Sequence, residues 1–270
     1  MAPAGPESGL LPATGSCVTF GDRSRCGGVA VTSPPITVAD AGDPCAPDLP
    51  VSLGRQIAFW APKGGAGATT LAVNVAAAAC EFGLRVAYAD LDHVGGDGAL
   101  FFGTAACELD SPAGAWRHTC GLRGHVARGD ADAVALASGL RAGHDLVVLD
   151  LPSGAYPDAI DCDLVVVVVT ASVAAIVRAR RALDTHPGGG VPICVVVAAA
   201  PGSGVDPADV DAVLGVASRS VVPHDGALAR RGDRGVFSYG LHRNAWANMV
   251  RELTEDLCAG LAAQSAQEPA

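Results

Sequence analysis

Three glycines and two threonines follow the only lysine of this chain. The segment Lys63-Gly64-Gly65-Ala66-Gly67-Ala68-Thr69-Thr70 lies between a short apolar run that ends at Pro62 and an alanine-rich stretch from Leu71 to Phe82. This order predicts a strand, a tight glycine-rich loop and a helix. Such a loop directs consecutive backbone N–H groups and a helix N-terminus at one point, which suits a phosphate group. The alternative is an ordinary strand-to-helix turn in which glycine only provides tightness.

The spacing departs from the usual Walker A pattern, which is Gly, four residues, then Gly-Lys-Ser/Thr. Pro62 stands where the first glycine belongs, and Ala68 stands where the lysine belongs. Lys63, however, precedes the double glycine, and every other cation among the 18 basic residues is an arginine. A single lysine at the start of a glycine-rich loop favours a functional role for this loop over an ordinary structural turn.

Carboxylates also stand at the ends of two predicted strands. The strand 85–89 runs into Asp90 and Asp92, and the apolar strand 145–149 runs into Asp150. Open α/β sheets bind ligands at the carboxyl ends of their strands. Asp150 has the setting of a Walker B acid, which orders water around Mg²⁺ while a loop hydroxyl ligates the metal. The alternative for Asp92 is a helix-capping turn, and Asp90 is expected to support the loop structurally.

Lys-Gly-Gly-x-Gly-x-Thr-Thr resembles the deviant Walker A loop of the ParA/MinD superfamily of dimerising ATPases, and the resemblance covers about residues 56–261. In that family an early lysine reaches across a dimer interface to the partner's nucleotide. A second lysine, before the threonine pair, contacts the bound phosphates. Lys63 corresponds to the first, and Ala68 stands at the second. With an alanine at this second position, the loop resembles that of the CpaE/TadZ branch, which is associated with pilus assembly, and that of the related septum-site-determining proteins.

The resemblance implies ATP and Mg²⁺ as cofactors and assigns a role to each motif. Asp92 helps to position the attacking water, and Pro223-His224-Asp225 is similar to a loop that borders the purine, with a plain turn and N-cap as the alternative. The implied catalytic residues are Asp92 and Lys63, and the implied metal residues are Thr69 and Asp150. The implied cofactor-binding residues are Lys63, Gly64, Gly65, Ala66, Gly67, Ala68, Thr69, Thr70, Pro223 and Asp225. The strand end 198–200 lacks the Asn that many relatives place near the base.

The elements that must position these residues alternate in type from Arg55 onward, as in a mostly parallel sheet with crossover helices. The β-branched run 164–169 predicts a strand covered on both faces. Further strands are predicted at 191–198 and 219–222. Helices are predicted at 112–120, 130–141, 173–183 and 244–263. The fold class is therefore α/β, a P-loop NTPase with a mostly parallel central sheet flanked by helices.

Composition divides the chain into a flexible Pro/Gly-rich tail (1–50), one ATPase domain (51–265) and a short tail (266–270). The net charge of −10 argues against specific nucleic-acid binding. The nine cysteines include no Cys-x-x-Cys pair, which suits a reducing cytoplasm. The apolar run 164–169 is too short to span a bilayer. We therefore expect a cytoplasmic protein without direct membrane insertion, which a partner could recruit to the membrane or the cell pole.

The resulting functional hypothesis is a homodimeric, nucleotide-gated ATP-binding protein with weak ATP hydrolysis, if any. It would localise or regulate a pilus, secretion or cell-division apparatus through partner proteins. One alternative is a small-molecule P-loop enzyme of the dethiobiotin-synthetase type, which is disfavoured because the region 95–103 offers only Asp97 and glycines as polar contacts. The other is a DNA-partitioning ParA, which is disfavoured by the acidic balance.

Overall fold

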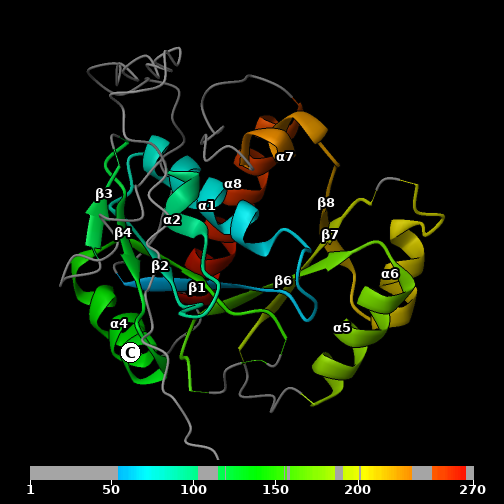
Figure 1. The fold of residues 1–270 in the computed structure, drawn as a ribbon, viewed down its shortest axis with the longest axis horizontal. Helices are drawn as coiled ribbons and strands as arrows, with labels where there is room; N and C mark the ends of the chain where they lie inside the picture. Colours follow the sequence, from blue (N-terminus) through cyan, green and yellow to red (C-terminus); the bar gives the residue numbers. More distant parts are fainter. Residues whose placement is uncertain are drawn as a thin grey trace, which may run out of the picture. The chain divides into compact units, whose positions relative to one another are not determined.

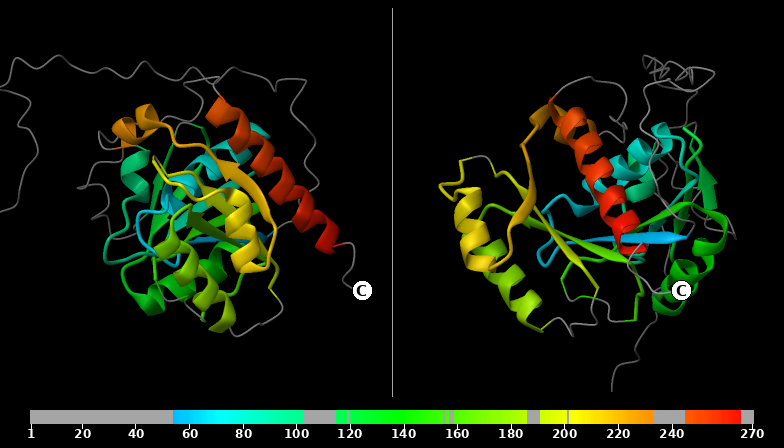
Figure 2. Two further views of the ribbon diagram at one scale, coloured as in Figure 1. Left: turned by 90° about the vertical axis from the view of Figure 1, so that its right-hand side faces the viewer. Right: turned by 180° about the vertical axis from the view of Figure 1, so that it is seen from behind.

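The computed structural model describes residues 54–102, 115–118, 120–154, 156, 159–185, 191–200, 202–232 and 245–265. The predicted tails, 1–50 and 266–270, lie outside the described residues. Within these ranges, no helix combines the length and the apolar character needed to cross a bilayer. The arrangement of the described part is shown in Figure 1 and Figure 2.

All described strands join one eight-stranded sheet with the order β3-β4-β2-β5-β1-β6-β7-β8 (Figure 1). In chain order they are β1 (Arg55–Trp60), β2 (Val86–Asp90), β3 (Ala115–Arg117), β4 (Arg123–Val126), β5 (Leu146–Asp150), β6 (Leu164–Thr170), β7 (Ile193–Ala198) and β8 (Ser218–Val222). Every neighbouring pair is parallel except β3 and β4. The predicted α/β fold with a mostly parallel sheet is confirmed.

Helices cover both faces of this sheet (Figure 2). They are α1 (Ala68–Glu81), α2 (Gly98–Phe101), α4 (Asp130–Leu140) with the 3-10 turn η1 (Arg141–Gly143), α5 (Val173–Thr185), α6 (Pro207–Leu214), α7 (Gly226–Gly232) and α8 (Ala245–Ser265). One core holds buried residues of α1, α2 and α8, and a second core on the opposite face holds those of α4, α5 and α6. Side chains of β1 alternate between the two cores, because successive residues of a strand point to opposite faces.

The central strands are mostly apolar because both faces of the sheet are covered, and the exceptions include the acids Asp90 and Asp150 at the ends of β2 and β5. All residues of β2 and β5 are buried, as are six of the seven residues of β6. Such strands have continuous apolar runs in place of alternating patterns. The helices predicted at 130–141 and 244–263 agree with α4 and α8 within a few residues at each end.

The helix predicted at 112–120 is wrong. Residues 115–117 form β3, an edge strand that pairs antiparallel with β4. Trp116 packs with its ring 4.7 Å from that of Phe102 and 6.4 Å from that of Tyr88, measured between centroids. A Cβ on Gly124 would lie 2.0 Å from the Trp116 ring, so only glycine leaves room for it. This long-range aromatic packing overrides the local pattern.

Candidate functional site

The glycine-rich loop lies at the carboxyl end of β1 and leads directly into α1. Gly65 has φ 78° and Gly67 has φ 90°, a left-handed conformation that glycine adopts without strain. Gly67 is the N-cap of α1, and its carbonyl accepts the first helical hydrogen bond from the N–H of Leu71 at 2.9 Å. The two glycines therefore allow a sharp turn between β1 and α1. The N-terminus of α1 then points to the space beyond the carboxyl end of β1.

A cavity of about 260 Å³ lies against this loop. Its lining includes Gly64, Gly65, Ala66, Gly67, Ala68, Thr69, Thr70, Asp92, Gly95, Asp97 and Ser153. Ser153, which follows β5, approaches the loop closely, since its Oγ would be 3.3 Å from a Cβ on Gly64. Backbone N–H groups and small side chains thus form most of the wall, which is the composition of a phosphate site.

The two predicted strand-end acids, Asp90 and Asp150, face each other below the loop. They are in register on β2 and β5 and are 0% and 2% exposed, respectively. Asp90 accepts hydrogen bonds from the backbone N–H of Gly98 at 2.9 Å and of Asp92 at 3.2 Å. Asp90 therefore holds the segment after β2 in place. Burial raises its pKa to about 6, against the effect of these hydrogen bonds.

Asp150 is held by two hydroxyl groups. The Tyr88 hydroxyl donates to its Oδ2 at 2.9 Å, and the Thr69 hydroxyl also hydrogen-bonds this carboxyl group. Burial, reinforced by the negative charge of Asp90, raises the pKa of Asp150 to about 8. Its Oδ1 is buried and has no hydrogen-bond partner in the described part of the chain. An unpartnered carboxylate oxygen beside a loop hydroxyl is a ready position for a cation.

These residues fit Mg²⁺. Thr69 and Asp150 supply hydroxyl and carboxylate oxygens, the hard ligands that this ion prefers. Within the described ranges, no group of three or more His, Cys, Asp and Glu residues could hold a metal by itself.

Asp92 lies on the wall of the same cavity and is partly exposed. Its Oδ1 accepts hydrogen bonds from the backbone N–H groups of Val94 at 3.2 Å and Gly95 at 3.0 Å. The turn predicted as its structural alternative is therefore present. Because Oδ1 accepts both of these bonds, Oδ2 is left to act on a bound molecule.

Two predicted site residues, the buried Asp150 and the partly exposed Lys63, line neither the loop cavity nor the larger one beside it. The residues after Lys63, Gly64 and Gly65, are exposed as well. The side chain of Lys63 therefore starts on the outer side of the loop.

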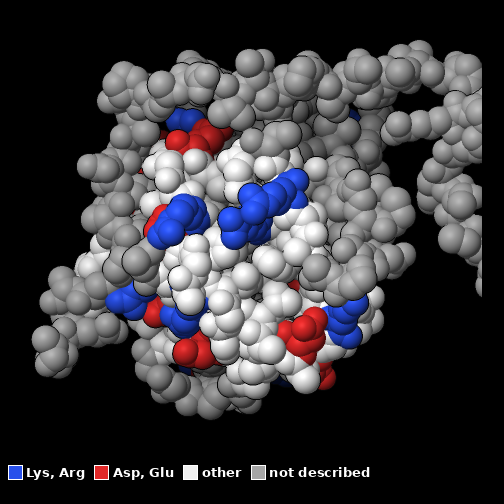
Figure 3. Space-filling model, turned by 90° about the vertical axis from the view of Figure 1, so that its left-hand side faces the viewer, with Lys and Arg blue, Asp and Glu red and all other residues white. Residues whose placement is uncertain are grey.

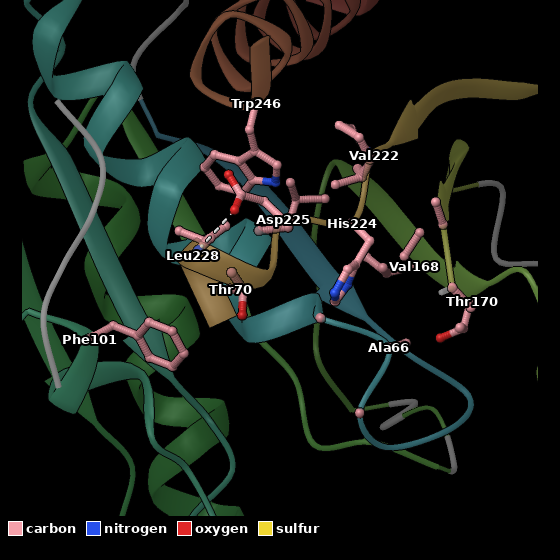
Figure 4. Close-up of a pocket in the computed structure, with 17 residues that line it drawn as sticks. Ala66, Thr70, Phe101, Val168, Thr170, Val222, His224, Asp225, Leu228 and Trp246 are labelled. Atoms are coloured by element: carbon pink, nitrogen blue, oxygen red, sulfur yellow. Dashed lines mark hydrogen bonds between the residues drawn. The ribbon is translucent and has the colours of Figure 1, made fainter. Parts of the chain in front are cut away.

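A second cavity, of about 460 Å³, adjoins the first along Gly65, Ala66 and Gly67 (Figure 4). Its other walls are largely apolar and include Phe101, Val168, Thr170, Val222, Pro223, His224, Asp225, Leu228 and Trp246. Asp225 accepts hydrogen bonds from the backbone N–H groups of Ala227 at 2.8 Å and Leu228 at 3.1 Å. It therefore caps α7, as its structural alternative predicted, and borders the cavity at the same time.

Several residues of the site had no role in the sequence analysis. Tyr88 contacts Asp150, and Phe101 and Trp246 line the larger cavity. Trp246 lies near the start of α8, within the helix predicted at 244–263. It is 6% exposed and packs in the core. The position of α8 also brings its ring to the cavity (Figure 4).

No protein-family model matches the chain, and no curated protein matches it. Solved structures do. The septum-site-determining protein MinD of Pyrococcus horikoshii, complexed with Mg-ADP, is 16% identical, with a TM-score of 0.65 over 78% of this chain and 99% of MinD. A ParA family ATPase of Chlorobium tepidum is 15% identical, with a TM-score of 0.65 over 74% and 98%.

A third structure is that of the Aquifex aeolicus MinC:MinD cell-division complex, whose matching chain is 17% identical, with a TM-score of 0.65 over 76% of this chain and 96% of that one. The similarity thus extends over almost the whole length of each of these proteins. At these identities it concerns the fold alone. The chain therefore has the mostly parallel α/β fold of the MinD/ParA ATPases.

Proposed function

We propose that this chain binds Mg-ATP in the two adjoining cavities and dimerises around the nucleotide, as a CpaE/TadZ-like protein that localises or regulates a pilus, secretion or cell-division apparatus. The observation that carries the nucleotide proposal is the contact between Thr69 and Asp150 beneath the glycine loop, with Asp150 Oδ1 left unpartnered. The likeness to a MinD that was solved with Mg-ADP supports it.

The walls of the two cavities support a proposal for where each part of the nucleotide would bind. The smaller, loop-lined cavity would receive the phosphates, which N–H groups of the loop can bind. The larger one would receive the base, between Phe101, Pro223 and Trp246, since its walls are mainly apolar. Mg²⁺, when bound, would supply positive charge beside the phosphates. Thr69 and Asp150 would hold it, and Asp92 would orient the water.

The dimer proposal concerns Lys63. Lys63, the single lysine of the chain, lines neither cavity of its own subunit. We therefore propose that it contacts the nucleotide bound to a second subunit. The proposed role in an apparatus is supported by the alanine at position 68, which resembles the CpaE/TadZ branch, and by the likeness to a MinD solved in complex with MinC. Partner proteins would then respond to bound nucleotide by recognising the dimer that it stabilises.

A thermal-shift titration tests nucleotide binding. Mg-ATP at about 100 times its dissociation constant should add about 2.7 kcal/mol to the free energy of unfolding. For a domain of this size we expect a rise in Tm of about 5–10 °C. Thr69→Ala should lose most of the Mg-dependent part of the shift, whereas Thr185→Ala, at the end of α5 and far from the loop, should keep it. Absence of a shift with ATP, ADP and GTP at millimolar concentration contradicts the proposal.

A further inference from the structure

The hairpin of β3 and β4 places two arginines opposite each other near the edge of the sheet. Arg117 pairs in register with Arg123, and both side chains are exposed. Like charges at directly opposed positions repel each other. Within the described ranges, neither guanidinium forms a hydrogen bond or an ion pair. Figure 3 shows this side of the molecule, where basic side chains gather near the middle of the described surface.

A cavity of about 470 Å³ opens beside these arginines. Arg117, Arg123, His125 and His144 form its polar wall, and none of the described residues that line it is acidic. Arg123 begins β4 and His144 precedes β5, so the cavity lies at the amino ends of the parallel strands. The glycine-rich loop lies at the opposite, carboxyl end. The two sites are therefore separate.

His144 supplies an independent sign that the cavity receives a ligand. The residue is only 6% exposed, and its Nδ1 donates to the carbonyl oxygen of Leu140 at 2.9 Å. Its Nε2 is buried and has no hydrogen-bond partner in the described part of the chain. Buried polar atoms are rarely left unpaired in native proteins. A ligand in the cavity could supply the partner that Nε2 lacks.

The acid nearest to this cluster is already occupied. Asp145 binds Arg85, with Nη2 to Oδ1 at 2.7 Å and Nε to Oδ2 at 3.1 Å, and this pairing lowers the pKa of Asp145. Around His125, burial lowers the pKa of the imidazole, and the charges of His144 and Arg123 add to the effect. The fixed positive charge of the cavity thus comes from Arg117 and Arg123, and none of its described lining residues supplies a compensating carboxylate.

We propose that this cavity binds a phosphate dianion, either free phosphate or the monoester group of a small molecule. Two guanidinium groups supply two fixed positive charges and planar pairs of donors, which match phosphate oxygens. His144 and His125 would contact the bound group from the inner wall. The volume exceeds that of one phosphate group and lies in the range of small-molecule sites. This site does not depend on nucleotide binding at the glycine-rich loop.

Histidine NMR of the full chain tests the proposal without interference from the loop. The imidazole signals of His125 and His144 are assigned with His125→Gln and His144→Gln, and phosphate is titrated against sodium chloride of equal ionic strength. We expect both signals to move with phosphate and to saturate. Arg117→Gln and Arg123→Gln should each weaken this binding about 10- to 100-fold, as expected for a hydrogen bond to a charged group. Arg178→Gln, which removes an exposed arginine from α5, should leave it unchanged.

A second arm uses phosphoserine and distinguishes the two sources of phosphate. Saturation by phosphoserine at lower concentration than by inorganic phosphate identifies a monoester as the ligand, and the reverse order identifies the free anion. If phosphate moves neither imidazole signal beyond the chloride control, the proposal is wrong. It is equally wrong if both arginine variants, with native melting curves, bind as tightly as Arg178→Gln.

Discussion

Asp90 and Asp150 lie in register at the carboxyl ends of β2 and β5, so two buried carboxyl groups meet under the glycine-rich loop. Burial raises the pKa of Asp150 to about 8 and that of Asp90 to about 6, from an ordinary value of 3.8. The folded protein therefore holds more protons than the unfolded chain between about pH 4 and pH 8. Its stability must fall as the pH rises through this window.

The first prediction is that Asp150→Asn removes much of this pH dependence. Without Mg²⁺, the wild-type chain should lose on the order of 3 kcal/mol of stability between pH 5 and pH 8, because the Asp150 carboxyl group ionises in the unfolded chain but keeps its proton in the folded protein. The variant keeps a neutral group there and should be the more stable protein at pH 8. Melting curves at several pH values measure both slopes. Asp184→Asn, which changes an exposed carboxylate, is the control, and equal slopes for Asp150→Asn and the wild type would contradict the prediction.

The second prediction concerns the support of Asp150 by Tyr88. A Cβ on Gly98 would lie 1.8 Å from the Tyr88 hydroxyl oxygen, so Gly98→Ala must displace the group that donates to Asp150. We expect a loss of about 1–3 kcal/mol, typical of overpacking in a core. Gly95→Ala is the matched control, because its Cβ would meet only Asp92 Oδ2 at an ordinary 3.7 Å. Denaturant unfolding would show the difference, and equal stability of the two variants would refute the close packing.

The third prediction separates the dimer from the nucleotide site. Lys63→Ala should elute as a monomer in the presence of Mg-ATP and should keep a normal melting curve without nucleotide, because Lys63 lines neither cavity of its own subunit. It should also retain most of the nucleotide-induced shift in Tm, which Thr69→Ala loses. Size-exclusion chromatography with light scattering gives the oligomeric state. If the variant still dimerises in the presence of ATP, Lys63 has no part in the dimer interface.

The fourth prediction concerns hydrolysis. Ala68 lines the loop cavity at the first position of α1, where it offers no charge to the phosphates. Removing one cation near a transferred phosphoryl group costs on the order of 10³ or more in rate, so the wild-type chain should hydrolyse ATP very slowly. Ala68→Lys should raise the rate clearly, and a further Asp92→Ala change should abolish the gain. Brisk turnover by the wild-type protein alone would show that another cation replaces the lysine.

The sheet and the glycine-rich loop could be predicted because their signals are local. Continuous apolar runs indicate strands with two covered faces, and glycines mark the turn before α1. Parallel topology then brings the ends of β1, β2 and β5 to one edge, which explains why Thr69, Asp92 and Asp150 could be placed together in advance.

The remaining features depend on contacts between distant segments. The bond between Tyr88 and Asp150 depends on how β2 lies beside β5, and no local pattern specifies that register. The strand β3 forms because Trp116 packs against Phe102 and Tyr88, which outweighs the helical pattern of its own segment. Trp246 reaches the larger cavity through the placement of α8 on the sheet.

The two edges of the sheet also bear on how copies of this chain can associate. At one edge β3 has only three residues and ends at the exposed Arg117; at the other, β8 carries the exposed Arg219, bound to Asp256 of α8 at 3.0 Å. Short, charged edge strands disfavour the edge-to-edge pairing that leads to aggregation. A dimer of this chain would therefore have to form through loop and helix surfaces, with each sheet ending within its own subunit.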